Sequence, residues 1–153
     1  MSIHATQQEI VEEFADFFDW EEKYAHIIAL GRSLAPFPEE HRTDANKVRG
    51  CQSQVWLHAE FKDGRVHFWG DSDALIVKGL VALALRVYAG RTSEEITATA
   101  PDFISQIGLD THLSPTRTNG FAAMIKQIKM YAIGFSVLAQ QQTREQMHEQ
   151  KAA

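Results

Sequence analysis

The chain has 153 residues, of which 44% are hydrophobic and 23% charged, with a formal net charge of −5. This composition is ordinary for a globular protein of one domain, which we expect to span residues 1–153 around a structured core at about 8–138. The acidic balance and the lack of a basic cluster argue against nucleic-acid binding. No apolar signal segment begins the chain, and Lys78 and Arg86 interrupt its most apolar stretch, so we expect a cytoplasmic protein without membrane association.

Two helices are predicted in the first part of the chain. Apolar residues at helical spacing predict a helix over about 6–18. Asp19 and Glu22 have the spacing of a capping box, which predicts the start of a second helix. Gly31 is a typical stop for that helix, and a polar loop follows to about residue 46.

A β-hairpin is predicted next. Residues 53–61 and 65–70 alternate between apolar and polar side chains, and Asp63 and Gly64 between them are typical of a tight turn. A short strand at 47–49 would extend this sheet to about three strands.

A helix with apolar side chains on most sides is predicted over 74–89, and its burial would make it the central helix of the core. Asp71, Ser72 and Asp73 precede it and are residue types that commonly cap helix N-termini.

The last third of the chain is predicted to be helical. Thr92 and Glu95 have capping-box spacing for a short helix, and Ser114 followed by Pro115 is typical of the start of a longer one. The polar, Gln-rich tail over 140–153 is expected to be frayed or exposed. The order helix, helix, hairpin, helices predicts an α+β fold, in which a small antiparallel β-sheet of about three strands packs against several α-helices.

Cys51 is the only cysteine, so it cannot form an intramolecular disulfide or complete a thiolate zinc site or an iron–sulfur cluster. Lone cysteines are often inert core residues. Here Gly50 precedes the cysteine and Gln52 follows it, which indicates a turn that presents the thiol. Arg49 could also lower the thiol pKa. From these residues alone, a reactive thiol and a core cysteine both remain open.

Two other kinds of site are open alternatives. If Lys62 pairs with Arg65 in the hairpin, His58, Glu60 and His67 share one face, and these types suit zinc or iron. The same residues also suit a solvated strand face, and no further ligand is identifiable. A hydrolase that pairs Cys51 with a histidine is likewise open, because such pairing cannot be read from sequence spacing.

The chain resembles the SufE family of sulfur acceptors over about residues 8–135. The segments that carry the resemblance are Gly50-Cys51-Gln52-Ser53-Gln54-Val55-Trp56, Gly70-Asp71-Ser72-Asp73-Ala74, Ile76-Val77-Lys78-Gly79-Leu80 and Leu113-Ser114-Pro115-Thr116-Arg117-Thr118-Asn119-Gly120-Phe121. Trp20-Glu21-Glu22-Lys23-Tyr24 and Leu30-Gly31 also fit the family's N-terminal helices. The SufU and NifU-like proteins, in contrast, need several cysteines.

The resemblance implies a SufE/NifU-like fold and a persulfide relay. A pyridoxal-phosphate cysteine desulfurase of the SufS type would pass sulfur to Cys51, which enhances the desulfurase, and the sulfur would then pass to a SufBCD-type scaffold for iron–sulfur cluster assembly. The cofactor belongs to the desulfurase, and we expect this chain to hold no cofactor or metal of its own. Whether the chain forms a homodimer is left open.

Supporting roles follow from the same resemblance. Gly50, Gln52 and Ser53 would shape the cysteine loop, and Asp71 and Asp73 are hypothesised to hold the helix start beside that loop or to contact the partner. Arg117 matches an arginine of the family signature, and we expect it to lie near Cys51 in the complex and to stabilise negative charge. We also expect the loop to be tucked inward in the free protein, which would protect a persulfide from solvent reductants.

Overall fold

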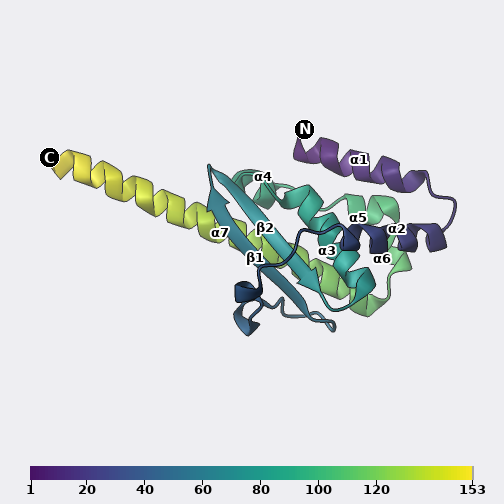
Figure 1. Ribbon diagram of the computed structural model, residues 1–153. Coiled ribbons are helices and arrows are strands. Elements are labelled where there is room, and N and C mark those ends of the chain that lie inside the picture. The colour runs from purple at the N-terminus through teal and green to yellow at the C-terminus, as the bar shows by residue number, and fades with distance from the viewer. Residues whose placement is uncertain (153) are drawn as a thin grey trace.

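The computed structural model describes residues 1–152 as an α+β protein, in which a two-stranded antiparallel sheet packs against helices (Figure 1). The elements in chain order are α1 (Ile3–Ala15), α2 (Trp20–Arg32), the 3-10 turns η1 (Glu39–His41) and η2 (Asp44–Asn46), β1 (Val55–Lys62), β2 (Arg65–Ser72), α3 (Leu75–Tyr88), α4 (Ser93–Ala98), α5 (Phe103–Ile107), α6 (Leu109–His112) and α7 (Pro115–Ala152). The α+β fold class predicted from the sequence is therefore confirmed.

The hairpin has the predicted register. Lys62 pairs with Arg65, and Asp63 and Gly64 form the turn with φ of 55° and 75°. Positive φ at both turn residues matches the right-handed twist of the strands, which explains the Asp-Gly pair. Lys47 contributes only a single bridge to Trp56 in place of a third strand.

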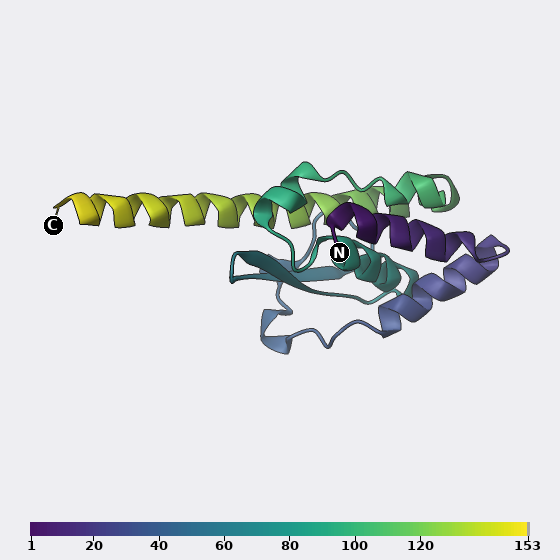
Figure 2. The same ribbon diagram turned by 90° about the horizontal axis from the view of Figure 1, so that it is seen from above.

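The hairpin separates two layers (Figure 2). Val55, Leu57 and Phe68 are buried on the face that the helices cover. On the other face lies the segment with η1 and η2, where Arg42 covers the ring of Trp56.

The start of α3 differs from the prediction. β2 continues to Ser72, and α3 begins at Leu75 with Ala74 as its N-cap and no side-chain cap bond. The Asp73 carboxylate instead accepts a hydrogen bond from the Gln54 N–H at 3.0 Å, and the Ser72 hydroxyl donates to the Gln54 carbonyl at 2.8 Å. The capping prediction is wrong here because these polar groups bind the neighbouring strand segment.

Central helix α3 packs closely on α2, as its apolar sequence predicts. A Cβ built on Gly79 would lie 2.1 Å from the Ile27 carbonyl oxygen, and one built on Gly31 would lie 2.7 Å from the Gly79 nitrogen. Gly31 is therefore not the stop of α2, which continues to Arg32. Both glycines allow the two backbones to approach each other.

Three predicted helix starts are present as expected. Asp19 accepts a hydrogen bond from the Glu22 N–H, and Thr92 and Glu95 form a complete capping box. Ser114 accepts from the Arg117 N–H at the start of α7. Each of these interactions is local in sequence, which is why spacing alone predicted it.

Helix α7 has a buried half and an exposed half. Phe121, Met124 and Ile128 are buried in its first half. The polar tail is exposed over residues 140–151, and it continues the helix to Ala152 (Figure 1). Good helix formers and the absence of glycine and proline after Gly134 explain this extension.

Length and composition alone would also allow α7 to cross a bilayer, since one window within Pro115–Lys151 has a mean hydropathy of 1.2, with 28% of it buried. Core helices of soluble proteins share this property. The buried apolar side chains of the first half of α7, which pack in the domain core, provide a reason for this hydropathy.

We predict that Gly79→Ala lowers the free energy of unfolding by about 3 kcal/mol or more, because its methyl group would overlap the α2 backbone. Urea denaturation followed by circular dichroism measures the change. Gly134→Ala is the matched control, since a Cβ there meets nothing within 4 Å, and helix propensity predicts a gain of up to about 1 kcal/mol. Equal stability of Gly79→Ala and the wild type would contradict the close packing.

Candidate functional site

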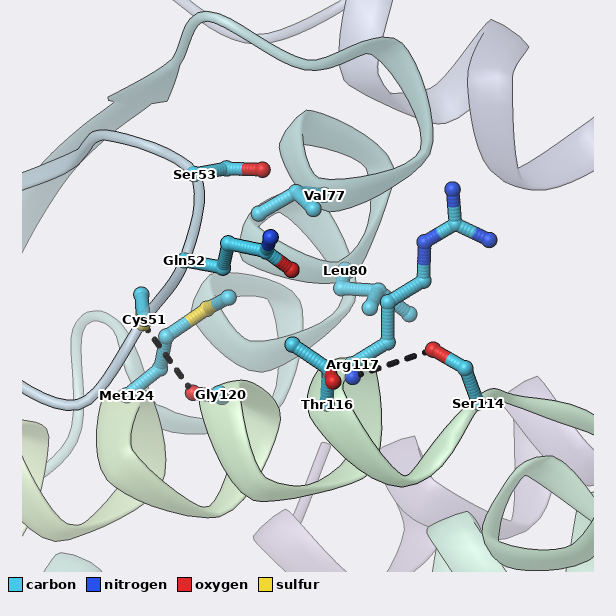
Figure 3. Close-up of a pocket in the computed structure, with 10 residues that line it drawn as sticks. All are labelled: Cys51, Gln52, Ser53, Val77, Leu80, Ser114, Thr116, Arg117, Gly120 and Met124. Atoms are coloured by element: carbon cyan, nitrogen blue, oxygen red, sulfur yellow. Dashed lines mark hydrogen bonds between the residues drawn. The ribbon is translucent and has the colours of Figure 1, made fainter.

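Cys51 lines a cavity of about 390 Å³ between its own loop, α3 and the start of α7 (Figure 3). The cavity has apolar and polar parts. Its apolar side chains are Val77, Leu80 and Met124, and its polar ones are Gln52, Ser53, Ser114, Thr116 and Arg117. Three of the segments that carried the family resemblance, 50–56, 76–80 and 113–121, are far apart in the chain but meet around one thiol.

The Cys51 thiol is half-buried and forms one hydrogen bond. Its Sγ donates to the Gly120 carbonyl at 3.4 Å (Figure 3). Burial raises the pKa of the Cys51 thiol above its ordinary value. The suggestion that Arg49 lowers this pKa is wrong, because Arg49 is exposed and desolvation of the thiol dominates. The site thus favours a protonated thiol in the free protein.

Two glycines lie against the cysteine, and one of them has a backbone conformation that favours glycine. Gly50 has a φ of +93°, a conformation that side chains disfavour, and it turns the chain into the cysteine. Gly120 is buried in α7, and a Cβ built on it would lie 3.5 Å from the Cys51 Sγ. The sequence indicated Gly50, whereas Gly120 was seen only as part of the family signature.

Asp71 connects two basic residues beside the hairpin. Its carboxylate lies 2.9 Å from the Arg42 guanidinium and 3.3 Å from the Lys78 ammonium in the first turn of α3. Burial by itself would raise the pKa of Asp71, but the hydrogen bonds from Arg42 and the Ser72 N–H, together with Lys78, lower it below its ordinary value. Asp71 therefore holds the helix start, in keeping with the hypothesis for it, but by an ion pair.

Asp73 contacts a different part of the site. Through the Gln54 N–H it holds the chain that follows the cysteine loop, and not the helix. Asp71 and Asp73 thus fix the two sides of the hairpin end separately, Asp71 toward α3 and Asp73 toward the cysteine segment.

Arg42 was not indicated by the sequence as a site residue. It lies in the loop before the cysteine, pairs with Glu39 and Asp71, and stacks on Trp56 with a distance of 4.8 Å from its guanidinium carbon to the ring centroid. No periodic pattern or motif connects Arg42 with Asp71, so no signal in a single sequence could have identified the pair.

Arg117 borders the cavity from the first turn of α7. Its side chain is exposed, and in Figure 3 the guanidinium extends away from Cys51. Within residues 1–152, no carboxylate forms an ion pair with this guanidinium. The charge is therefore available at the rim, while contact with the thiol would require the side chain to change its orientation.

Neither alternative site has the side chains that it would require. His58 stacks on His41, and the described residues contain no group of three or more histidine, cysteine or acidic side chains arranged to hold a metal. No histidine occurs among the described residues that line the Cys51 cavity, so a hydrolase would lack its base there.

The fold and the cavity define a small α+β protein with one half-buried thiol at the junction of three signature segments. A family model described as SufE, an Fe–S metabolism associated domain, matches residues 8–132. The chain belongs to the SufE family. This membership supports a role in Fe–S metabolism.

Named relatives agree with this membership. The chain is 46% identical over 131 residues to an uncharacterized SufE-like protein of Rhizobium meliloti (strain 1021), with 82% of this chain and 94% of the relative covered. It is 44% identical over 128 residues to an uncharacterized SufE-like protein of Synechocystis sp. (strain ATCC 27184 / PCC 6803 / Kazusa), covering 84% and 80% respectively. A solution structure of a hypothetical protein from Thermus thermophilus shares the fold, with a TM-score of 0.71 at 20% identity and coverage of 84% of this chain and 94% of that one.

We predict that Asp71→Asn lowers the free energy of unfolding at pH 7 by about 1–3 kcal/mol, because two cations lose their carboxylate. The folded-state pKa of Asp71 is lowered, so its contribution is complete above the ordinary value of 3.8 and is lost as the pH falls through the folded-state pKa. The difference between variant and wild type should therefore shrink in acid.

Urea denaturation at several pH values measures this difference. Asp44→Asn is the control, because Asp44 pairs with Lys47 but is 95% exposed, and we expect little change at any pH. A stability difference for Asp71→Asn that stayed constant down to strongly acidic pH would contradict the role of its charge.

Proposed function

We propose that this protein is a sulfur acceptor and carrier that takes persulfide sulfur from a PLP-dependent cysteine desulfurase of the SufS type onto Cys51. In the same proposal it enhances the desulfurase and passes the sulfur to a SufBCD-type scaffold for iron–sulfur cluster assembly in the cytoplasm. The observation that carries the proposal is the single half-buried thiol in a cavity formed by the matched family segments.

One thiol is sufficient for the chemistry. The Cys51 thiolate attacks the terminal sulfur of the desulfurase persulfide, a bond forms between the two sulfurs, and the bond to the desulfurase cysteine breaks to leave a thiolate there. The proton of Cys51 must leave before the attack. Since burial raises the pKa of Cys51, we propose that docking of the partner withdraws the thiol from its buried position and makes it reactive.

The cavity supports the carrier half of the proposal. Cys51 is half-buried beside apolar side chains, and its Sγ lies against the Gly120 carbonyl, which would leave the sulfur less accessible to water and small reductants than an exposed thiol. A second cysteine nearby could release the sulfur early by forming a disulfide, and the sequence has none. These features would keep a persulfide on Cys51 intact while the protein moves from the desulfurase to the scaffold.

Incubation with a SufS-type desulfurase and free cysteine, followed by intact mass spectrometry, tests the proposal. We expect adducts of whole sulfur atoms that a reductant removes, and no adducts on Cys51→Ser or in samples without cysteine. The Cys51→Ser protein is the matched control because it changes one atom. An unmodified wild-type protein, beside a desulfurase shown to be active, would overturn the proposal.

Arg117 is proposed to stabilise the negative charge on sulfur during transfer. We expect Arg117→Ala to slow sulfur acceptance roughly tenfold or more, since hydrogen bonds to charged groups contribute about 1.5–3 kcal/mol. Single-turnover transfer at saturating desulfurase measures the rate apart from binding. Arg144→Ala, which removes an exposed arginine from the far part of α7, should transfer at the wild-type rate. Equal rates for both variants would refute this role.

A further inference from the structure

The segment that leads to Cys51 is held against the hairpin on the face opposite the core. We call residues 33–49, between the end of α2 and Gly50, the strap; it contains η1 and η2 (Figure 2). It returns to the sheet where the Val48 N–H donates to the Val55 carbonyl at 2.8 Å, directly before the turn that presents the cysteine. Movement of the strap would therefore be transmitted to the cysteine loop.

Two side chains of the strap attach it to the hairpin before that return. Arg42 is bound to the Asp71 carboxylate, and this pair stays ionised in mild acid because the pKa of Asp71 is lowered. The preceding residue, His41, stacks on His58 of β1 with ring centroids 3.6 Å apart and an angle of 8° between the planes. The second attachment thus consists of two titratable rings in face-to-face contact.

The surroundings of the histidine pair determine its response to protons. The Glu60 carboxylate of β1 lies 3.8 Å from the His58 Nε2, Glu40 of η1 adds a second negative charge, and Trp69 of β2 packs at 5.7 Å between ring centroids. Burial lowers the pKa of His58 and the positive charge of His41 lowers it further, whereas Glu60 and Glu40 act in the opposite direction.

We propose that the stacked pair of His41 and His58 is a pH-sensitive clasp that holds the strap and, through it, the inward position of Cys51. Neutral rings, or one neutral and one protonated ring, can stack, but a second proton places two like charges about one ring thickness apart. The pair then separates, the strap keeps its Arg42 ion pair and its backbone contacts at Lys47 and Val48, and the cysteine loop becomes more accessible. This device operates whatever Cys51 reacts with.

The sign of the pH effect follows from His58. Its folded-state pKa lies below the ordinary 6.5, so the folded clasp binds fewer protons than the open strap. The closed form is fully favoured above the ordinary value and loses stability as the pH falls below it. Acid therefore opens the clasp, and a neutral medium closes it.

The first test is an NMR titration of the histidine ring protons in the wild type and in His41→Phe. Phenylalanine keeps an aromatic ring for stacking and removes the charge, so His58 should titrate at a higher pH in the variant. His58→Phe removes the His58 signals and so identifies them in the spectrum. Unchanged titration of His58 in a folded His41→Phe protein would overturn the coupling of the two rings.

The second test measures protection of Cys51, as the maleimide labelling rate of urea-unfolded protein divided by that of native protein at the same pH. This ratio cancels the pH dependence of the thiol reaction itself. Between about pH 7.5 and about pH 5.5, protection should fall several-fold in the wild type, fall less in His41→Phe, where His58 stays buried without the charge of His41, and stay nearly constant in His58→Phe. Equal pH dependence in all three proteins would overturn the proposed link between the clasp and Cys51.

Discussion

The contact between α2 and α3 is the constraint on which the other layers depend. Gly31 and Gly79 allow the two backbones to touch, and this close contact fixes α3 in the middle of the molecule. α3 also packs against the hairpin. A Cβ on Gly70 would lie 2.5 Å from a Val81 methyl group, so the sheet approaches α3 closely, as α2 does on another side. Val77 and Leu80, on the same helix, form part of the cysteine cavity. One buried helix thus sets the positions of the N-terminal helices, the sheet and the thiol, and small residues at its contacts make this arrangement possible.

The cysteine site combines burial with the need for reactivity. A thiol that is half-buried and bonded to a carbonyl oxygen is chemically quiet, since burial raises its pKa. In the proposed function, the same position would protect a persulfide on Cys51 from solvent. The cysteine loop is held at several places. Cys51 itself packs against the edge of the core and bonds to Gly120, and the hydrogen bonds of Gln54 with Asp73 and Ser72 and the contacts of the strap hold the chain on either side of it. The protein thus separates a rigid framework from a locally held loop.

Interactions between neighbours in the sequence were predictable, and those between distant residues were not. The Asp63–Gly64 turn set the strand register, and Asp19 and Thr92 cap the helices that their spacing predicted. Asp71 and Asp73 are also residue types that commonly cap helices. Their partners are instead Arg42 and Gln54, which belong to segments that reach them only in the folded chain. Glycine commonly ends helices, but the glycine at position 31 is explained by the close contact of α2 with α3. For the site, the sequence placed Cys51 in a turn and Arg117 at a helix start, and we expected the cysteine loop to be tucked inward. The bond of the thiol to Gly120, in contrast, depends on α7 packing beside the loop and could not be predicted.

Helix α7 makes the molecule longer in one direction than its small core requires. It runs unbroken over 38 residues, which corresponds to about 57 Å, and its first turns border the cysteine while its residues 140–151 are exposed (Figure 1). A protein docked over Cys51 would therefore contact the N-terminal end of α7, whereas the C-terminal part of this helix extends away from the core. The distance along the helix from Gly120, beside the thiol, to Glu149 is roughly 44 Å at 1.5 Å per residue. Because of this length, a small tilt of the domain around Cys51 corresponds to a large displacement of the distant end of α7.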